Sequence, residues 1–439
     1  MTDDARDDAP LAGIVVADLS RVLAGPLVGA TLADLGARVI KVEQPGTGDG
    51  TRSWSPPASA TGSTYFDSAN RGKESVALDL TDPADLALAH ELIARADVVI
   101  ENFRPGGAAR LGLDRDALLA EHPGLVWCSI TGYGSQPGGA DRAGYDFVLQ
   151  AASGLMHITG DADGPPTKAG VALVDVLTAK DALAGILAAL LRRGRTGRGG
   201  LVEVALLSSI QAALVNQLQA VLGPIDDDAS ADAASPTPET EPRRAGSGHP
   251  SIVPYQLLET GDGPLAVAVG TDGQFRAFAA LLGEPALAAD PRFATNPQRV
   301  VHRDALVPLL EAALAADGAE AWEQRMLAAG LVASRVRTIG EGLQLAADVG
   351  LDPIRQVHGG AGTGRQLASP IRLDRVARTA SAAPPLLGEH DTAVRAWLSE
   401  PQPAPSPSGD RTAPDAAASD RSATKPPASG PTAPDRGAP

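Results

Sequence analysis

The sequence is short of the residues on which disulfide scaffolds, membrane spans and base-stacking surfaces depend. Cys128 is the one cysteine in 439 residues, so an internal disulfide is excluded and no oxidising compartment is indicated. Aromatic residues make up 3%, too few for the stacking platforms of single-strand nucleic-acid binders. No uninterrupted apolar run reaches about 18 residues, the length that a transmembrane helix needs. The start, MTDDARDDAP, lacks the basic-then-apolar order of a secretory signal, so we expect a cytoplasmic protein without a membrane partner.

Positive charge is also scarce, which limits the possible partners. Lys and Arg total 37 against 53 Asp and Glu, a formal net charge of −16. Binding to nucleic acid needs a clustered excess of cations, so no nucleic-acid partner is expected. A few cations and helix N-termini can still bind an anionic small molecule. The seven histidines lack metal-ligand spacing, so the sequence predicts no metal site.

What the sequence does contain is an alternation of short apolar runs and helical patterns over its first two hundred residues. The apolar runs predict strands at 13–20, 37–43, 75–80, 97–102, 125–131 and 201–206. Amphipathic patterns between them predict helices, which implies a parallel sheet covered on both faces. A longer helix is expected from about Leu177 to Arg193, ended by Gly194 and Gly197. The fold class is therefore α/β.

Composition divides the chain further. After Gly223 the sequence becomes acidic and rich in Pro, Ala and Ser, and the last forty or so residues lack large apolar groups. A mixed strand and helix pattern follows the acidic stretch and predicts a smaller α+β domain. The expected division is a disordered N-terminus at 1–10, a large α/β domain at 11–223, a flexible acidic insert at 224–245, a small domain at 246–331, a C-terminal segment at 332–398 returning to the large domain, and a disordered tail at 399–439.

Three motifs have an ordinary structural interpretation. GTGDG at 46–50 lacks the full dinucleotide-binding spacing and is interpreted as a turn. Cys128 lies inside an apolar strand, where cysteine is usually a small buried hydrophobe. Asp175 precedes or begins the long helix, a position typical of a helix cap. That position has a chemical consequence as well, because a carboxylate at a helix N-terminus stays ionised, as a nucleophile must.

Several longer stretches carry a family resemblance when taken in order. They include LAGIVVADLSRVLAGP, YFDSANRGKESVALDL, VIENFRPGGAARLGL, GYDFVLQAASGLM and KAGVALVDVLTAKDALAG, within a region from Leu11 to about Leu398. On these stretches the chain resembles the family III CoA-transferases. The resemblance implies a Rossmann-like large domain with a smaller domain, and two chains interlocked as a homodimer.

The resemblance also implies a reaction. Asp175 matches the aspartate nucleophile of that family, which moves CoA from an acyl-CoA to a small carboxylic acid through a mixed anhydride and an aspartyl-CoA thioester. Coenzyme A and acyl-CoA enter as substrates, and no permanently bound cofactor is expected. Gly246 and Gly248 in AGSGHPS either shield the aspartyl intermediate or are simply turn residues.

Contacts with CoA are implied residue by residue. The matching positions are Val22, Leu23, Ala24, Asn102, Arg104, Arg110, Leu111, Arg142, Tyr145 and Asp146. Three family positions that carry cations hold Gln44, Thr81 and Ala143 here. Phosphate recognition is therefore expected to move to Arg38, Arg71, Lys73 or Arg142.

Two alternatives stay open. The related α-methylacyl-CoA racemases use a histidine at the position of Tyr145, and a phenol with a pKa near 10 is a poor base at pH 7. Transfer is therefore favoured over racemisation, which α-proton exchange in heavy water would reveal. A non-catalytic acyl-CoA-binding protein would bind the thioester yet form no covalent adduct.

Overall fold

The computed structural model describes residues 9–223, 241–377 and 380–401. The predicted disordered N-terminus, acidic insert and disordered tail fall outside these residues, apart from a few positions at their edges. The compact unit that holds the described elements ends at Leu398. Within the described residues, no helix is both long and apolar enough to cross a membrane.

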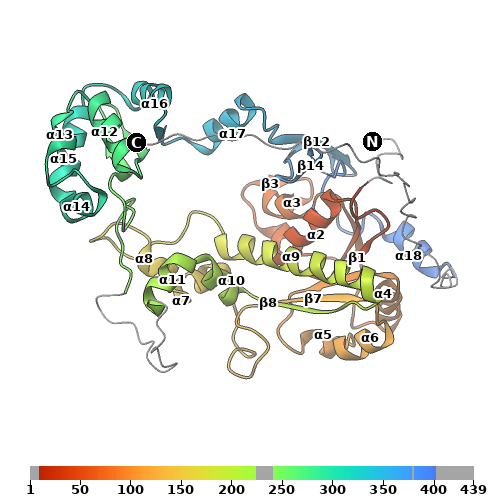
Figure 1. Cartoon of the computed structure of the whole chain (residues 1–439). Helices are drawn as coiled ribbons and strands as arrows, with labels where there is room; N and C mark the ends of the chain where they lie inside the picture. The colour runs from red at the N-terminus through yellow and green to blue at the C-terminus, as the bar shows by residue number, and fades with distance from the viewer. Residues whose placement is uncertain (1–8, 224–240, 378–379, 402–439) are drawn as a thin grey trace, which may run out of the picture. The chain divides into compact units, whose positions relative to one another are not determined.

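A six-stranded sheet forms the centre of the large domain (Figure 1). Its spatial order is β5 (Lys73–Ala77), β2 (Arg38–Glu43), β1 (Val15–Asp18), β6 (Val98–Glu101), β7 (Val126–Thr131) and β8 (Gly200–Ala205). Every neighbouring pair is parallel. The chain starts in the middle and builds outward on both sides, which is the doubly wound order. The predicted α/β class is confirmed.

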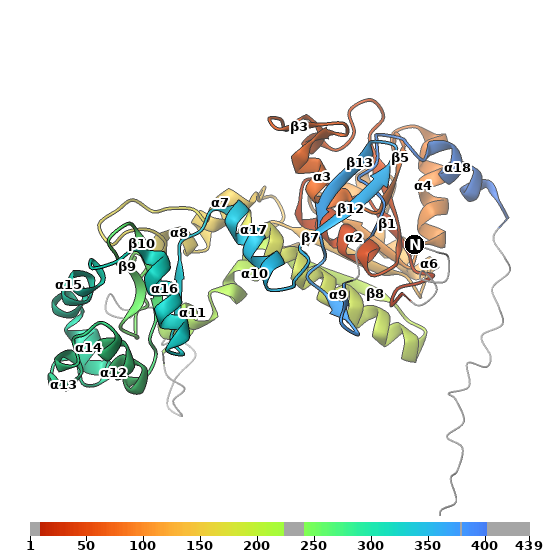
Figure 2. The same cartoon turned by 90° about the horizontal axis from the view of Figure 1, so that it is seen from above.

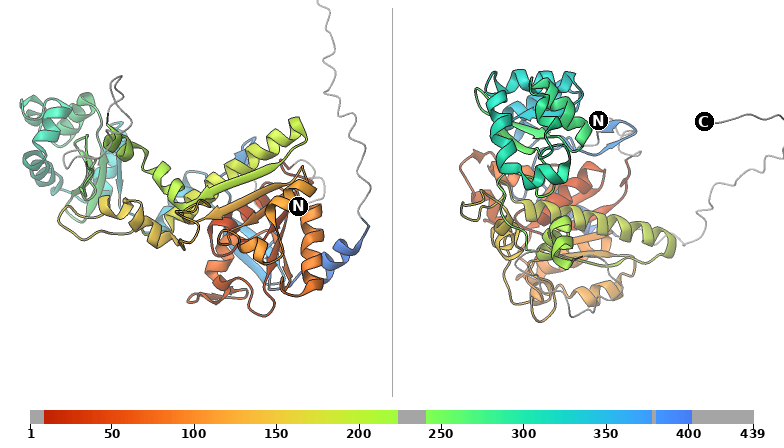
Figure 3. Two further views of the ribbon diagram at one scale, coloured as in Figure 1. Left: turned by 90° about the horizontal axis from the view of Figure 1, so that it is seen from below. Right: turned by 60° about the vertical axis from the view of Figure 1, so that its left-hand side comes forward.

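Helices cover both faces of this sheet (Figures 2 and 3). One face packs against α2 (Ala24–Asp34), α9 (Leu173–Thr196) and α10 (Leu206–Ala213), and the other against α4 (Pro83–Arg95), α6 (Arg115–Glu121) and α18 (Asp391–Ser399). Strand β6 shows the alternation, since Val98 and Ile100 face the first layer and Val99 the second. The four central strands therefore contribute apolar side chains to both layers, as a covered parallel sheet requires, whereas the edge strands β5 and β8 contribute to one layer each.

Shorter elements connect these layers at the carboxyl edge of the sheet. They are η1 (Gly50–Ser53), β3 (Ala58–Ser59), β4 (Gly62–Ser63), α3 (Thr64–Asn70), α5 (Gly107–Arg110), α7 (Asp146–Ala152), α8 (Leu155–Ile158) and α11 (Val215–Leu222). The GTGDG stretch forms the predicted turn, and Asp49 then caps η1 by accepting the Thr51 N–H.

A second core lies in the predicted small domain. Antiparallel strands β9 (Tyr255–Glu259), β10 (Pro264–Ala268) and β11 (Val332–Arg335) pack against α12 (Asp272–Leu281), α13 (Ala286–Ala289), α14 (Asn296–Val301), α15 (Arg303–Leu314) and α16 (Ala319–Ala328). Phe275, Phe278, Phe293 and Trp322 are its large buried aromatic residues. Because β11 pairs with β10, this sheet includes residues beyond the predicted boundary at 331.

The remaining elements follow β11. They are α17 (Ile339–Asp348), the hairpin β12 (Ile354–Gly359) and β13 (Gly362–Leu367), and the short pair β14 (Arg372–Leu373) and β15 (Val376–Ala377). After them the chain contacts the edge of the large sheet, where the Asp391 carboxylate accepts the Ala77 N–H at 2.7 Å. Arg395 pairs with Asp85 of α4 at 2.8 Å, so α18 lies against α4 (Figure 2).

Candidate active site

A cavity of about 330 Å³ opens at the carboxyl ends of β1, β6 and β7. This edge is where the strand order reverses, and open α/β sheets bind ligands at such switch points. The predicted residues that line it are Val22, Leu23, Ala24, Asn102, Arg104, Arg142, Tyr145, Asp146 and Asp175. Arg110, Gly246 and Gly248 do not line it, and Leu111 lines a neighbouring cavity.

Asp175 stands in the first turn of α9. The helix begins at Leu173, earlier than the predicted Leu177, and its N-cap residue Ala172 offers no side-chain hydrogen bond. The cap comes from another helix: the Asp146 Oδ1 of α7 accepts the Val174 N–H at 2.7 Å and the Asp175 N–H at 3.3 Å. Two of the orphan N–H groups of the helix are satisfied in this way.

Asp146 is itself held in place. Its Oδ2 accepts a hydrogen bond from Gln150 Nε2 at 2.7 Å, and the buried Gln150 also accepts the Ala169 N–H at 2.8 Å. Gln150 therefore links Asp146 to the segment that enters α9. This arrangement makes Asp146 a positioning residue for the helix that carries Asp175.

Burial changes the acidity of the Asp175 carboxyl. Burial and the nearby negative charge of Asp146 raise the pKa of Asp175 to about 7. The sequence-based expectation that the helix N-terminus keeps this group fully ionised is therefore wrong near neutral pH, because burial and a like charge outweigh the helix dipole. Asp175 is divided between its acid and its anion there.

Tyr65 of α3 is close enough to Asp175 and Asp146 to be affected by their charges. Burial, followed by the charges of Asp175 and Asp146, raises the pKa of Tyr65 to about 12. Its ring contacts the Trp54 ring edge-on, with centroids 5.0 Å apart. Tyr65 is thus a neutral phenol that can donate a hydrogen bond beside two carboxyl groups.

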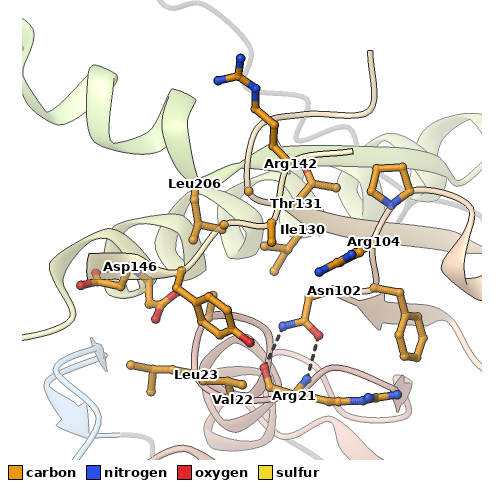
Figure 4. Close-up of a pocket in the computed structure, with 18 of the residues that line it drawn as sticks. Arg21, Val22, Leu23, Asn102, Arg104, Ile130, Thr131, Arg142, Asp146 and Leu206 are labelled. Atoms are coloured by element: carbon orange, nitrogen blue, oxygen red, sulfur yellow. Dashed lines mark hydrogen bonds between the residues drawn. The ribbon is translucent and has the colours of Figure 1, made fainter. Parts of the chain in front are cut away.

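The loop after β1 forms another wall and has a strained backbone. Val22 has a φ of 72°, a left-handed conformation that costs a β-branched residue about 1–2 kcal/mol. Asn102 holds the preceding residue at both ends, accepting the Arg21 N–H at 2.8 Å and donating to the Arg21 carbonyl at 2.7 Å (Figure 4). Asp49 accepts the Val22 N–H at 3.2 Å.

Buried charges support this loop from below. Lys41 donates to the Ser20 carbonyl at 2.8 Å and pairs with Asp49 at 3.0 Å. Lys73 pairs with Asp18 at 2.8 Å, and all four side chains are about 1% exposed or less. Burial alone would raise the pKa of Asp18, but Lys73 and Lys41 hold it below its usual range. Removing one member would leave an unpaired buried charge, which costs about 3–5 kcal/mol.

Of the four cations expected to bind phosphate, three are engaged in internal ion pairs. Arg38 pairs with Glu74 at 2.8 Å, Arg71 pairs with the buried Asp34, and Lys73 is fully buried against Asp18. Arg142 does line the cavity, but in Figure 4 its side chain points away from Asn102, whereas Arg104 points toward it. The internal ion pairs of the fold, which the sequence does not reveal, determine which cations remain available to bind phosphate.

The other predicted residues have plain positions. Tyr145 is 63% exposed and precedes α7 as its N-cap residue. Gly246 has a φ of 57° and donates its N–H to the Gly160 carbonyl, and Gly248 lies against Arg303. Cys128 is fully buried in β7, and burial raises the pKa of its thiol to about 12, as expected for an unreactive core cysteine.

Sequence reasoning missed two residues of the site, Arg21 and Asp49. Arg21 lies inside SRVLAGP, directly before the predicted CoA contact Val22, and Asp49 lies inside the GTGDG turn. The short motifs around Arg21 and Asp49 do not show that the two residues meet at the same loop in the folded chain. Among the described residues, no group of three or more His, Cys, Asp or Glu is arranged to hold a metal ion.

Comparisons with known proteins identify the family of this chain. The family model "CoA-transferase family III" matches residues 11–391. A succinate–glutarate CoA-transferase of Agrobacterium fabrum is 46% identical over 69% of this chain and 74% of its own length, and a mouse succinyl-CoA:glutarate CoA-transferase is 38% identical over 87% and 84%. A solved CaiB/BaiF family protein of Brucella suis is 39% identical, covers 89% of this chain and 99% of its own, and superposes with a TM-score of 0.77. The chain belongs to CoA-transferase family III and is a CoA-transferase.

Proposed function

We propose that this enzyme transfers CoA between two small dicarboxylic acids, with Asp175 as the nucleophile. The observation that carries the proposal is the position of Asp175, whose partly buried carboxyl lines the cavity at the switch point of the sheet. The substrate class rests on the relatives, which are named for succinate and glutarate. Both acids are short and carry a carboxylate at each end.

The proposed reaction passes through two kinds of covalent intermediate. An Asp175 oxygen attacks the thioester carbonyl and expels the CoA thiolate, leaving a mixed anhydride. The thiolate attacks the side-chain carbonyl of Asp175, which releases the donor acid and forms aspartyl-CoA. The acceptor carboxylate then attacks that carbonyl and expels the thiolate, giving a second anhydride. Attack of the thiolate on the acceptor carbonyl yields the new acyl-CoA and frees Asp175.

The raised pKa of Asp175 suits both halves of this reaction. A more basic carboxylate is a stronger nucleophile, and at a pKa of about 7 a large fraction is still ionised at neutral pH. Tyr65, kept neutral by its own raised pKa, is a candidate donor to the developing oxyanion. Asp146 takes the positioning role described above.

We propose further that CoA binds along the loop after β1 and the loop after β6. The backbone of Val22, Leu23 and Ala24 and the side chain of Arg104 line one side of the cavity. Tyr145 and Arg142 line the same cavity, while Asn102 acts by fixing the first loop. Arg110 and Leu111 flank the neighbouring cavity region, and Gly246 and Gly248 remain the proposed shielding loop.

A homodimer completes the proposal. Helix α17 has no buried residue, and its apolar side chains Ile339 and Leu345 are 94% and 41% exposed. An amphipathic helix with an uncovered apolar face needs a partner surface, and a second copy supplies one.

We also expect the enzyme in the cytoplasm, consistent with its single, buried cysteine.

Mass spectrometry of the intact protein tests the proposed nucleophile. After incubation with succinyl-CoA, the wild type should gain the mass of CoA minus water, and peptide mapping should locate the adduct on Asp175. Asp175→Asn should fold, bind CoA and form no adduct. Asp181→Asn, an exposed change on the same helix, should behave as wild type. An adduct in Asp175→Asn would overturn the assignment, and α-proton exchange in heavy water without transfer would favour the racemase alternative.

A further inference from the structure

We propose that Arg21 binds the diphosphate of CoA. Nothing above assigns a ligand to this side chain, and the proposal rests on CoA being the substrate of this cavity. The claim concerns the nucleotide half of the molecule, which lies far along the chain of CoA from the reacting thioester. Three observations support this role: the position of the Arg21 guanidinium, the contacts that orient it, and the shortage of other unpaired cations near it.

The Arg21 backbone is fixed before any ligand arrives. Both hydrogen bonds of the Asn102 amide go to the N–H and carbonyl of Arg21. On either side, Lys41 holds the Ser20 carbonyl and Asp49 holds the Val22 N–H. The direction in which the Arg21 side chain leaves the loop is therefore set by three neighbours. Preorganisation of this kind reduces the entropy that ligand binding would otherwise cost.

The guanidinium is oriented but not neutralised. Its carbon lies 5.0 Å from the centroid of the Phe103 ring, in cation–π contact. Among the described residues, no carboxylate forms an ion pair with Arg21, whereas Arg38, Arg52 and Arg71 all have such partners. A stacked arginine keeps its N–H donors available along the ring edge. Such a side chain is ready to bind a phosphate through two parallel hydrogen bonds.

Arg21 also stands at the junction of two cavities. It lines the 330 Å³ cavity that contains Asp175 and a second cavity of about 350 Å³ beside the ends of β1 and β2. Phe103 lines both as well. A CoA molecule whose thioester reaches Asp175 extends its nucleotide away from that carboxyl. If the nucleotide occupies the second cavity, the diphosphate passes the junction where Arg21 stands.

The second cavity has little other positive charge to offer. Among the described residues, the cations that line it are Arg21 and Lys41. Lys41 is about 1% exposed and already pairs with Asp49. Gln44, Asp79 and Thr81 also line it and bring no positive charge. In a chain with a net charge of −16, an unpaired arginine at this point is the available counter-charge for a dianion. Arg21 thus supplies what Gln44 and Thr81 lack.

The experiment compares substrates that differ only in the nucleotide. Steady-state kinetics would be measured with succinyl-CoA, succinyl-dephospho-CoA, which keeps the diphosphate, and succinyl-pantetheine, which lacks it. Arg21→Gln should raise the KM for succinyl-CoA about tenfold and leave kcat unchanged, since a charge-assisted bond to a partly exposed phosphate is lost. The same rise is expected with the dephospho compound and none with the pantetheine ester.

Arg21→Lys should recover part of the loss, because it keeps the charge but not the paired donors. Arg276→Gln, an exposed arginine on α12, is the matched control and should change nothing. An unchanged KM for succinyl-CoA in Arg21→Gln would overturn the proposal. So would an equal loss with the pantetheine ester, which would mean that Arg21 acts on the loop or the acyl end. A rise in KM confined to succinyl-CoA would mean that Arg21 binds the 3′-phosphate, which would refute the diphosphate assignment.

Calorimetric titration of free CoA separates this proposal from the proposed reaction. If the wild type binds CoA but transfers nothing between succinate and glutarate, the substrate assignment fails. The Arg21→Gln variant should nevertheless bind CoA about tenfold more weakly than the wild type. Equal binding by the two proteins would refute the role of Arg21 whatever the acid substrates are.

Discussion

The pKa of the Asp175 carboxyl is raised to about 7, well above that of an ordinary aspartate. Two features of the fold act on it together, since the first turn of α9 buries it and α7 brings Asp146 beside it. The same Asp146 that caps the helix thus also supplies the like charge. Asp146 therefore contributes to the cap of α9 and, after burial, to the raised pKa of Asp175, and a substitution that removes only its charge separates the two effects.

The pH dependence of transfer should reveal this pairing. In the proposed reaction only the ionised form of Asp175 attacks, so kcat/KM for succinyl-CoA should rise with pH and level off above an apparent pKa near 7. Asp146→Asn removes the like charge but keeps an oxygen that can cap α9. The rising limb of its profile should therefore move to lower pH, measured between pH 5 and 9. Asp181→Asn should leave the profile in place, and a limb unmoved by Asp146→Asn would refute the coupling.

At the residue scale, the sequence predicts candidate chemical groups more readily than the contacts that hold them in place. Asp175 and Asp146 stand out from the motifs around them, but the bond between Asp146 and the N–H groups of α9 joins residues 28 and 29 positions apart. The Asn102 clamp spans 81 positions. Such contacts depend on how the loops of a sheet edge meet, which no local pattern encodes. The same reason explains why Arg38, Arg71 and Lys73 looked free and are not.

At the element scale, the turn from β1 into α2 is the most constrained part of the site. Helix α2 begins at Ala24, directly after the strained Val22, and Gly25 of its first turn lies against Ser20. A methyl group at position 25 would overlap the Ser20 side chain. The close approach is possible only because glycine has no Cβ, and it lets the loop fold back over the end of β1.

Gly25→Ala should therefore damage both the fold and CoA binding. Overpacking of this kind costs about 1–3 kcal/mol, and the displaced Ser20–Leu23 loop should raise the KM for succinyl-CoA. Thermal unfolding and kinetics measure the two effects. Gly194→Ala is the control, because this glycine lies in α9 with open space around its Cα and alanine favours the helix. Equal behaviour of the two variants would show that the close approach is unimportant.

Elements were predictable where burial enforced a pattern. Each of the six large-domain strands contains an apolar run, so these runs identified the strands despite errors of up to three residues at the ends. Strand β9 has a weak apolar pattern in the sequence, because three of its five side chains are exposed. The first turn of α9 was missed because its cap is supplied by Asp146, far away in sequence.

At the scale of the whole molecule, the doubly wound order matters more than any single contact. It brings the ends of β1, β6 and β7 to one edge, so residues from loops near positions 22, 103 and 145 share a cavity with Asp175. The alternation of strands and helices in the sequence predicted this class of fold. It could not predict a partner for α17, whose apolar face remains exposed in the single chain.

Light scattering coupled to size exclusion should show a dimer for the wild type. Leu345→Lys places a charge on the apolar face of α17 and should shift the mass toward the monomer at low protein concentration, since a buried charge opposes association. Gln344→Lys changes the polar face of the same helix and should leave the dimer intact. A monomeric wild type, or a dimer unaffected by Leu345→Lys, would contradict the proposed role of this face.

The position of Asp175 has a consequence for the stability of the whole protein. Its pKa is about 7 when folded and about 3.9 when unfolded, so folding favours the protonated form, and the stability this provides is lost as pH rises through 7. Allowing for partial solvent exposure, the ionised group costs about 1–2 kcal/mol above pH 7. Asp175→Asn should unfold at a higher temperature than the wild type at pH 8, and this advantage should shrink between pH 7 and pH 4. If Asp175 is the nucleophile, as proposed, the variant that lacks activity is also the more stable protein above pH 7, which is a trade-off between stability and activity.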